Sequence, residues 1–179
     1  MDNVDTEEAI VMQGIIGEKT IFAIEYIIRR AKYSYQHFSE YTRIWVGNQH
    51  FGRFDEPELL GMLATHFIIS QKNVPEDVFD YENPKQLFRF LERDMKNEQT
   101  YYGHFICFFP AYDYFNSYAV RHQDEYIFMW QLRRKKWDTF PDYPKKILHY
   151  RVSKDYADRV IIAWNKLSKV ARETFTLPE

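Results

Sequence analysis

The stretch from Thr20 to Ser70 changes the spacing of its apolar residues partway along, and this change constrains the fold more than any other feature. Residues 20–28 and 41–46 are rich in β-branched and aromatic side chains, which are typical of strands. A third, shorter strand is predicted at 51–54. Apolar residues with helical spacing then predict a helix at 56–70. Strands followed by an amphipathic helix predict a sheet with that helix on one face.

Two local signals mark the joints of this stretch. We expect a two-residue turn at Asn48-Gln49, flanked by Gly47 and Gly52, because glycine adopts positive φ without a Cβ clash and so suits short hairpins. Asp55 is expected to cap the following helix, since its carboxylate can accept from the free N–H groups of the first turn.

The rest of the chain alternates between the same two spacings and shows no repeat or linker. We therefore expect one domain over residues 1–179, in which residues 1–13 are frayed. Trp164 lies centrally on the apolar stripe of the last helix and is predicted to be buried. The predicted fold class is α+β, with a mainly antiparallel sheet of about five to seven strands and three helices packed on it. The further expected elements are helices at 84–96 and 153–172 and strands at 102–109, 115–121, 126–133 and 147–152.

Composition excludes several classes of protein. The single cysteine, Cys107, rules out an internal disulfide framework and a cysteine metal cluster. The acidic N-terminus does not have the pattern of a signal peptide, and no apolar run approaches the roughly 20 residues needed to span a bilayer. We therefore expect a cytoplasmic protein without a membrane partner. Aromatic residues make up 18% of the chain, so we expect a ring-rich core with some tyrosines left for a contact surface.

Signatures of catalysis and metal binding do not occur in the sequence. Its six histidines have no partner at a diagnostic spacing, and there is no HExxH, GxSxG or glycine-rich phosphate loop. The acidic residues at 76–82 do not follow the order of a calcium loop. We therefore predict a protein that is not an enzyme, with no cofactor and no metal site. The histidines are His37, His50, His66, His104, His122 and His149.

The loop predicted at 71–83 concentrates four carboxylates around two aromatic side chains. It is either an ordinary solvated connection or a binding site for a basic protein partner. In the second case the carboxylates would steer the encounter with the partner, and the aromatic rings would anchor the contact. A loop near 112–114 is the second candidate. The candidate partner-binding residues are Glu76, Asp77, Phe79, Asp80, Tyr81 and Glu82 in the first loop, and Tyr112 and Asp113 in the second.

Basic residues favour the second half of the chain, although the net charge of the whole is −2. Residues 99–179 carry 13 basic and 9 acidic side chains, including the run RRKKW at 133–137. Cations beside a tryptophan can bind phosphate and stack on a base. A small nucleic-acid-associated protein that uses this basic C-terminal half is therefore the alternative function. Such runs are usually solvated hairpin tips, so nucleic acid is the less favoured partner.

The segment FAIEY…YTRIWVGNQHFGRFDEPELLGMLATHF resembles the N-terminal part of immunity proteins from bacterial polymorphic-toxin and contact-dependent growth inhibition systems. In that family a strand of the form F-x-I-x-[YF] precedes I-W-[VI]-G-x-x-[FI]-G, an acidic residue and a helix. The resemblance covers about 50 of the 179 residues, and the polar insert at 29–40 departs from the pattern. The matching positions are Phe22, Ile24, Tyr26, Ile44, Trp45, Val46, Gly47, Phe51, Gly52 and Asp55.

This resemblance implies a non-enzymatic inhibitor made in the cytosol beside a toxin gene. Such a protein binds its cognate toxin domain and blocks the active site or holds the toxin inactive. The toxins are often nucleases with basic substrate grooves, and a basic groove would suit the acidic loop at 76–82.

Overall fold

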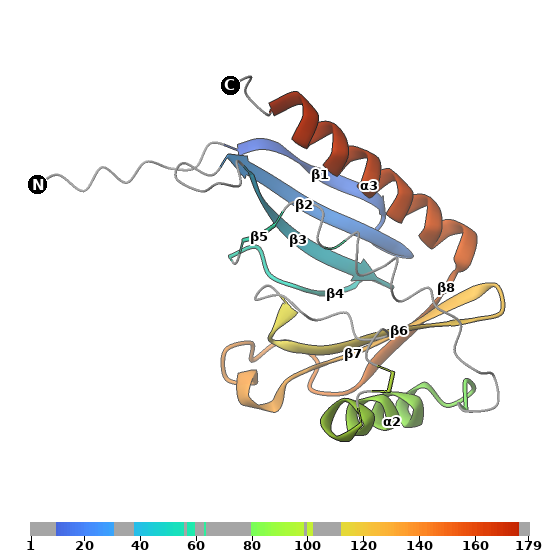
Figure 1. Ribbon diagram of the computed structural model, residues 1–179. Helices are drawn as coiled ribbons and strands as arrows, with labels where there is room; N and C mark the ends of the chain where they lie inside the picture. Colours follow the sequence, from blue (N-terminus) through green and yellow to red (C-terminus); the bar gives the residue numbers. More distant parts are fainter. Residues whose placement is uncertain are drawn as a thin grey trace, which may run out of the picture.

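The computed structural model describes residues 10–30, 38–55, 57–59, 63, 80–98, 100–101 and 112–175 (Figure 1). Strands and helices follow one another in an α+β order, as expected. The elements are β1 (Ile10–Glu18), β2 (Phe22–Arg30), β3 (Phe38–Val46), β4 (Gln49–Phe51), β5 (Glu58–Leu59), α2 (Pro84–Asn97), β6 (Phe115–His122), β7 (Glu125–Leu132), the short 3-10 helix η3 (Arg134–Lys136), β8 (Leu148–Ser153) and α3 (Lys154–Phe175).

The first sheet is antiparallel and has the strand order β1-β2-β3-β4, with β5 also paired to β3. Its centre is the β2–β3 pair, in which Ile24 lies opposite Ile44. Both residues are fully buried, and both strands were predicted from their β-branched and aromatic residues. The alternating burial along β2 and β3 gives this sheet one face for the core.

The turn between β3 and β4 lies one residue earlier than predicted. Gly47 and Asn48 have positive φ angles of 57° and 66°, the backbone of a type I′ turn, and Gln49 already pairs with Val46. The predicted turn at Asn48-Gln49 and strand at 51–54 are therefore wrong in register. A Cβ at position 47 would approach the ring of Tyr150 to 2.4 Å, so glycine is required both by its φ and by this neighbour.

Residues 10–13, which we expected to be frayed, belong to β1, while residues 1–9 lie outside the described part of the chain. β1 pairs with β2 along its length, from Ile10 opposite Arg29 to Glu18 opposite Phe22. Gly17, the second-last residue of this strand, has a φ of 92°. A Cβ there would lie 2.4 Å from the carbonyl oxygen of Phe22 and 2.9 Å from Val160 of α3, so only glycine fits between β2 and α3.

The helix predicted at 56–70 does not begin where expected. Residues 58–59 form β5, which pairs with Ser39 and Glu40 of β3. Asp55, the predicted helix cap, instead forms an ion pair with Arg53. Leu63 is helical and buried, and the rest of the predicted helix lies outside the described residues. The apolar spacing and the acidic residues that predict the helix do not exclude a short strand. The edge of β3 at Ser39 and Glu40 is where residues 58–59 pair.

The second sheet is a separate antiparallel meander in the order β6-β7-β8. The β6–β7 hairpin has its predicted turn at Gln123-Asp124, where Gln123 has a φ of 50°. β8 was predicted at 147–152 and is found at Leu148–Ser153. The predicted strand at 102–109 lies outside the described residues.

Two sheets packed on each other replace the single sheet of five to seven strands that we predicted. The ring of Phe22 stacks on that of Phe128 at 5.0 Å, and Phe51 contacts Trp130 at 5.4 Å. β7 is buried on both faces, because α2 covers the side that points away from the first sheet (Figure 1). Strand patterns alone do not distinguish one large sheet from two stacked ones.

Two of the three predicted helices are present in the described residues. α2 was predicted at 84–96. Its cap is Asn83, whose side-chain oxygen accepts from the backbone N–H of Gln86 at 3.2 Å, and Pro84 occupies the first turn. α3 was predicted at 153–172 and packs on β1 and β2. Trp164 is fully buried and contacts the ring of Tyr26 at 5.3 Å, which confirms its predicted place in the core.

Candidate functional site

The described end of the acidic loop, residues 80–82, leads directly into α2. Its backbone is folded into a turn, in which the Asp80 carboxylate accepts from the N–H of Glu82 at 3.1 Å and the Asp80 carbonyl accepts from the N–H of Asn83. Asp80 is exposed, and the side chain of Glu82 is 85% exposed. Both carboxylates therefore face solvent from a backbone of defined shape. Glu76, Asp77 and Phe79 lie outside the described residues.

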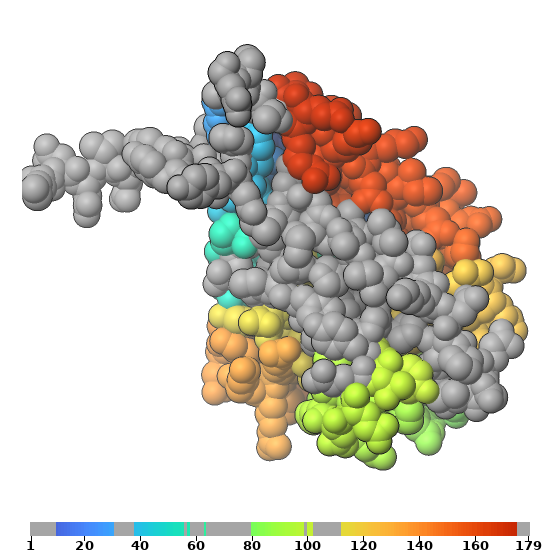
Figure 2. Space-filling view, in the orientation of Figure 1, coloured from blue at the N-terminus to red at the C-terminus, as the bar shows by residue number. Residues whose placement is uncertain are grey.

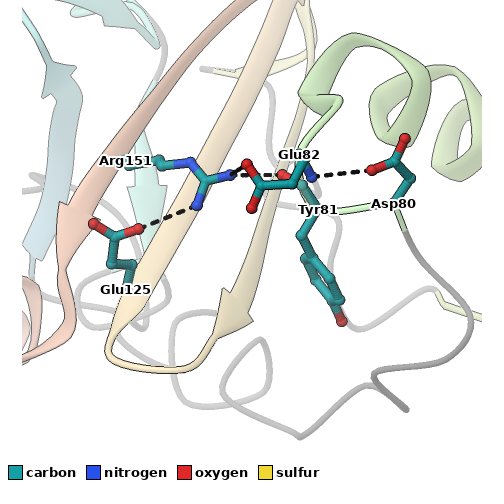
Figure 3. Close-up of polar contacts among 5 residues, drawn as sticks. All are labelled: Asp80, Tyr81, Glu82, Glu125 and Arg151. Carbon is teal, nitrogen blue, oxygen red and sulfur yellow. Dashed lines mark hydrogen bonds and ion pairs between the residues drawn. The ribbon is translucent and has the colours of Figure 1, made fainter.

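Arg151 of β8 fastens this loop to the second sheet (Figure 3). Its guanidinium donates to the carbonyl of Tyr81 at 2.7 Å and lies 3.5 Å from the carboxylate of Glu82. Its other terminal nitrogen lies 3.3 Å from the carboxylate of Glu125 at the start of β7. A single cation thus joins the loop, β7 and β8, and it partly balances the negative charge of the loop.

The ring of Tyr81 points inward and is only 5% exposed. It stacks on the imidazole of His122 at the end of β6, with 4.1 Å between ring centres. The Tyr81 ring therefore packs against the second sheet, and the solvent-exposed surface of residues 80–82 comes from Asp80 and Glu82. A direct contact between Tyr81 and a partner stays a prediction.

The structure does not place Tyr112 and Asp113 next to the described residues of the first loop, 80–82. Tyr112 is fully buried, and a hydrogen bond of 2.8 Å joins its hydroxyl to that of Thr42 in β3. Asp113 is exposed, but it lies just before β6 begins, whereas Tyr81 packs at the other end of that strand. An eight-residue strand separates the two ends by about 23 Å.

The basic run at 133–137 is partly absorbed into the fold. The indole N–H of Trp137 donates to the carbonyl of Leu132 at 3.2 Å, and Arg134 and Lys145 lie over its ring. Nearby, two cations lie over the ring of Tyr114, Arg53 at 3.9 Å and Lys136 at 3.8 Å from its centre. A hydrogen bond from Lys136 lowers the pKa of the Tyr114 phenol. Several of these cations therefore already pack on aromatic rings of the same molecule.

The histidines that the structure describes do not form a catalytic or metal-binding group. His50 contacts the rings of Trp45 and Tyr143, and burial lowers its pKa to about 4, so it is neutral near pH 7. Burial also lowers the pKa of His149. Within the described ranges, no cluster of histidine, cysteine or carboxylate side chains is suited to hold a metal ion. Nor does any helix in those ranges have the length and apolar character to cross a bilayer.

A hollow beside α2 is the surface feature that sequence reasoning missed. It has a volume of about 520 Å³ and is lined by Asn83, Lys85, Gln86, Arg89, Phe90 and Arg93. Its three cations recur every four residues, so their spacing on one side of a helix could have been read from the sequence. The hollow begins at Asn83, immediately after the acidic loop.

Comparison with known proteins identifies the fold. No protein-family model matches the chain, and no curated protein matches its sequence. The crystal structure of CdiI from Burkholderia dolosa AUO158 superposes with a TM-score of 0.53 and covers 87% of this chain and 99% of its own. The chain shares the fold of CdiI. Because only 9% of the residues are identical, this likeness concerns the fold alone, which agrees with the fold implied by the sequence resemblance.

Proposed function

We propose that this protein is an immunity protein, which binds and neutralises a cognate toxin domain in the cytosol without catalysing a reaction. The observation that carries the proposal is the fold shared with CdiI, which extends over 87% of this chain. The sequence resemblance between Phe22 and Asp55 supports it independently. We further propose that the toxin is a nuclease whose basic substrate groove is the surface that the immunity protein covers.

The acidic loop supports this mode of binding through its shape and charge. Asp80 and Glu82 are exposed, and the Arg151 contacts hold the backbone beneath them. A backbone that is already held in one conformation, as that of residues 80–82 is, loses less conformational entropy when a partner binds. Its carboxylates would attract a basic groove during diffusional encounter, and the bulk of the second sheet and α2 would then exclude substrate from that groove.

Co-purification with the product of the neighbouring gene tests the function. We expect a stoichiometric complex with a toxic domain, whose toxicity disappears when the two proteins are co-expressed. Recovery of the tagged chain alone from native cells that express the toxin would contradict the proposal.

The role of the loop is tested by the double variant Asp80→Asn/Glu82→Gln, which removes two charges and keeps the Asp80 side chain able to accept its turn hydrogen bond. We expect the association rate with the toxin to fall about tenfold at low salt and much less at moderate salt. The matched control is Asp138→Asn/Asp142→Asn, which makes the same charge change at two other exposed positions. Equal rates for the two double variants would remove the loop from the interface.

A further inference from the structure

The hollow beside α2 is strongly basic on the side that the helix forms. Lys85, Arg89 and Arg93 line it, and none of them forms an ion pair with a carboxylate of the described residues. Phe90, which is 38% exposed, provides an apolar part of the wall. We call these three cations the α2 basic stripe.

The α2 basic stripe destabilises the helix that carries it. Lys85 lies in the first turn, at the positive end of the helix dipole, and that turn contains no acidic residue. Each cation of the stripe lies four residues from the next, a spacing at which like charges repel. These cations therefore destabilise the helix. An anionic group of a binding partner would reduce their mutual repulsion.

We propose that the α2 basic stripe binds an extended acidic segment of the toxin. This inference rests on the proposed function, and it gives the interface two adjoining charged parts, the acidic loop at 80–82 and the stripe that begins at Lys85. Asn83 joins them, because it ends the loop, caps α2 and lines the hollow. A partner would then need a basic region and an acidic segment side by side, which fixes its orientation and rejects toxins with a different charge order.

The dimensions of the stripe match an extended segment. Cations four residues apart on a helix are separated by about 6 Å along its axis, so Lys85 and Arg93 are about 12 Å apart. Side chains on one face of a strand recur about every 6.6 Å. Alternate carboxylates of an extended segment therefore fall close to successive cations. The hollow of about 520 Å³ has room for a few side chains of such a segment.

The test is the double variant Arg89→Glu/Arg93→Glu, measured for binding to a catalytically inactive form of the toxin domain recovered in the co-purification experiment. The matched control is Lys166→Glu/Lys169→Glu, which makes the same change in net charge at two exposed positions of α3. Figure 2 shows α2 and α3, which carries Lys166, on opposite sides of the molecule. We expect the α2 variant to associate about tenfold more slowly than the control at low salt, with a shallower salt dependence.

A melting temperature of Arg89→Glu/Arg93→Glu equal to that of the control variant excludes misfolding as the cause, and we expect this result because the charge reversal exchanges one repelling pair at i,i+4 for another. If the toxin binds and the two double variants associate equally fast, the stripe lies outside the interface, while the proposed function stands. If no toxin is captured, the proposed function fails and this inference fails with it. If the wild-type chain binds a decathymidine oligonucleotide or forms dimers, and Arg89→Glu/Arg93→Glu abolishes that binding or that dimer, the stripe serves a nucleic acid or a second copy instead.

Discussion

Arg151 is expected to stabilise the protein more than its half-buried position suggests. We consider the substitution Arg151→Met, which keeps much of the apolar stem of the side chain and removes its charge and donors. The guanidinium donates to the Tyr81 carbonyl at 2.7 Å and lies within 3.5 Å of the carboxylates of Glu82 and Glu125. The variant therefore loses one short hydrogen bond and two ion pairs together.

The hydrogen bond accounts for most of the expected loss. A hydrogen bond with one charged partner contributes about 1.5–3 kcal/mol to the free energy of unfolding. The ion pair with Glu82 contributes close to nothing, because that carboxylate is 85% exposed, and the pair with Glu125 contributes about 0.5 kcal/mol. We expect Arg151→Met to lower the free energy of unfolding by about 2–3 kcal/mol.

Urea unfolding at low salt and at about 1 M salt separates the two contributions, because salt screens exposed ion pairs. The control is Glu82→Gln/Glu125→Gln, which removes the ion pairs and leaves the bond to the Tyr81 carbonyl in place. We expect the control to lose about 0.5 kcal/mol, and to lose less at high salt. The reasoning would be refuted if the control lost as much as Arg151→Met, since the hydrogen bond to the loop would then contribute nothing.

Two further predictions concern the core and its titration. Trp164→Ala should lower the free energy of unfolding by about 3–5 kcal/mol, because the indole is fully buried against Tyr26, and an unchanged melting temperature would contradict this packing. The pKa of His50 is lowered from 6.5 to about 4, so the unfolded chain binds a proton there more readily than the folded one. Its contribution is complete above about pH 6.5 and is lost as the pH falls toward 4, about 2 kcal/mol after allowance for its partial exposure. His50→Gln should flatten the curve of stability against pH in that window, and an unchanged slope would contradict the assignment.

The elements that could be predicted are those whose signals lie within a few residues. α2 was located to within a residue at each end, because Asn83 and Pro84 define its start chemically. The β6–β7 hairpin was found from two alternating runs and a polar turn. β1 was missed because its glycine-containing sequence becomes a strand through β2 and through the contact of Gly17 with Val160, far along the chain.

The errors in register and in layering have different causes. A type I′ turn at 48–49 would require positive φ at Gln49, whereas glycine and asparagine both tolerate it, so the local sequence itself favours the turn at 47–48. The ring of Tyr150 leaves space only for a glycine at position 47. The division into two sheets depends on which aromatic faces meet, as Phe22 and Phe128 do, and no periodicity carries that information.

The charge of the candidate site could be predicted from the sequence, but the contacts that hold its backbone in place could not. Asp80 and Glu82 were identified from the density of carboxylates around them. Arg151 is 70 residues from Tyr81 and was indistinguishable in the sequence from any other basic residue. The inward position of the Tyr81 ring depends on His122, which belongs to another part of the chain. Charge is a local property of sequence, whereas the order of a loop depends on the partners that the fold brings to it.

The place of α3 in the chain has a consequence for synthesis. This helix is synthesised after all the described strands, yet it covers β1 and β2, which precede the other strands in the chain. Strands of the first sheet can pair early, because each lies beside its neighbour in the sequence, but the side of Tyr26 that Trp164 covers remains exposed until α3 has been synthesised. A nascent chain therefore presents an exposed apolar surface on the first sheet until α3 has docked.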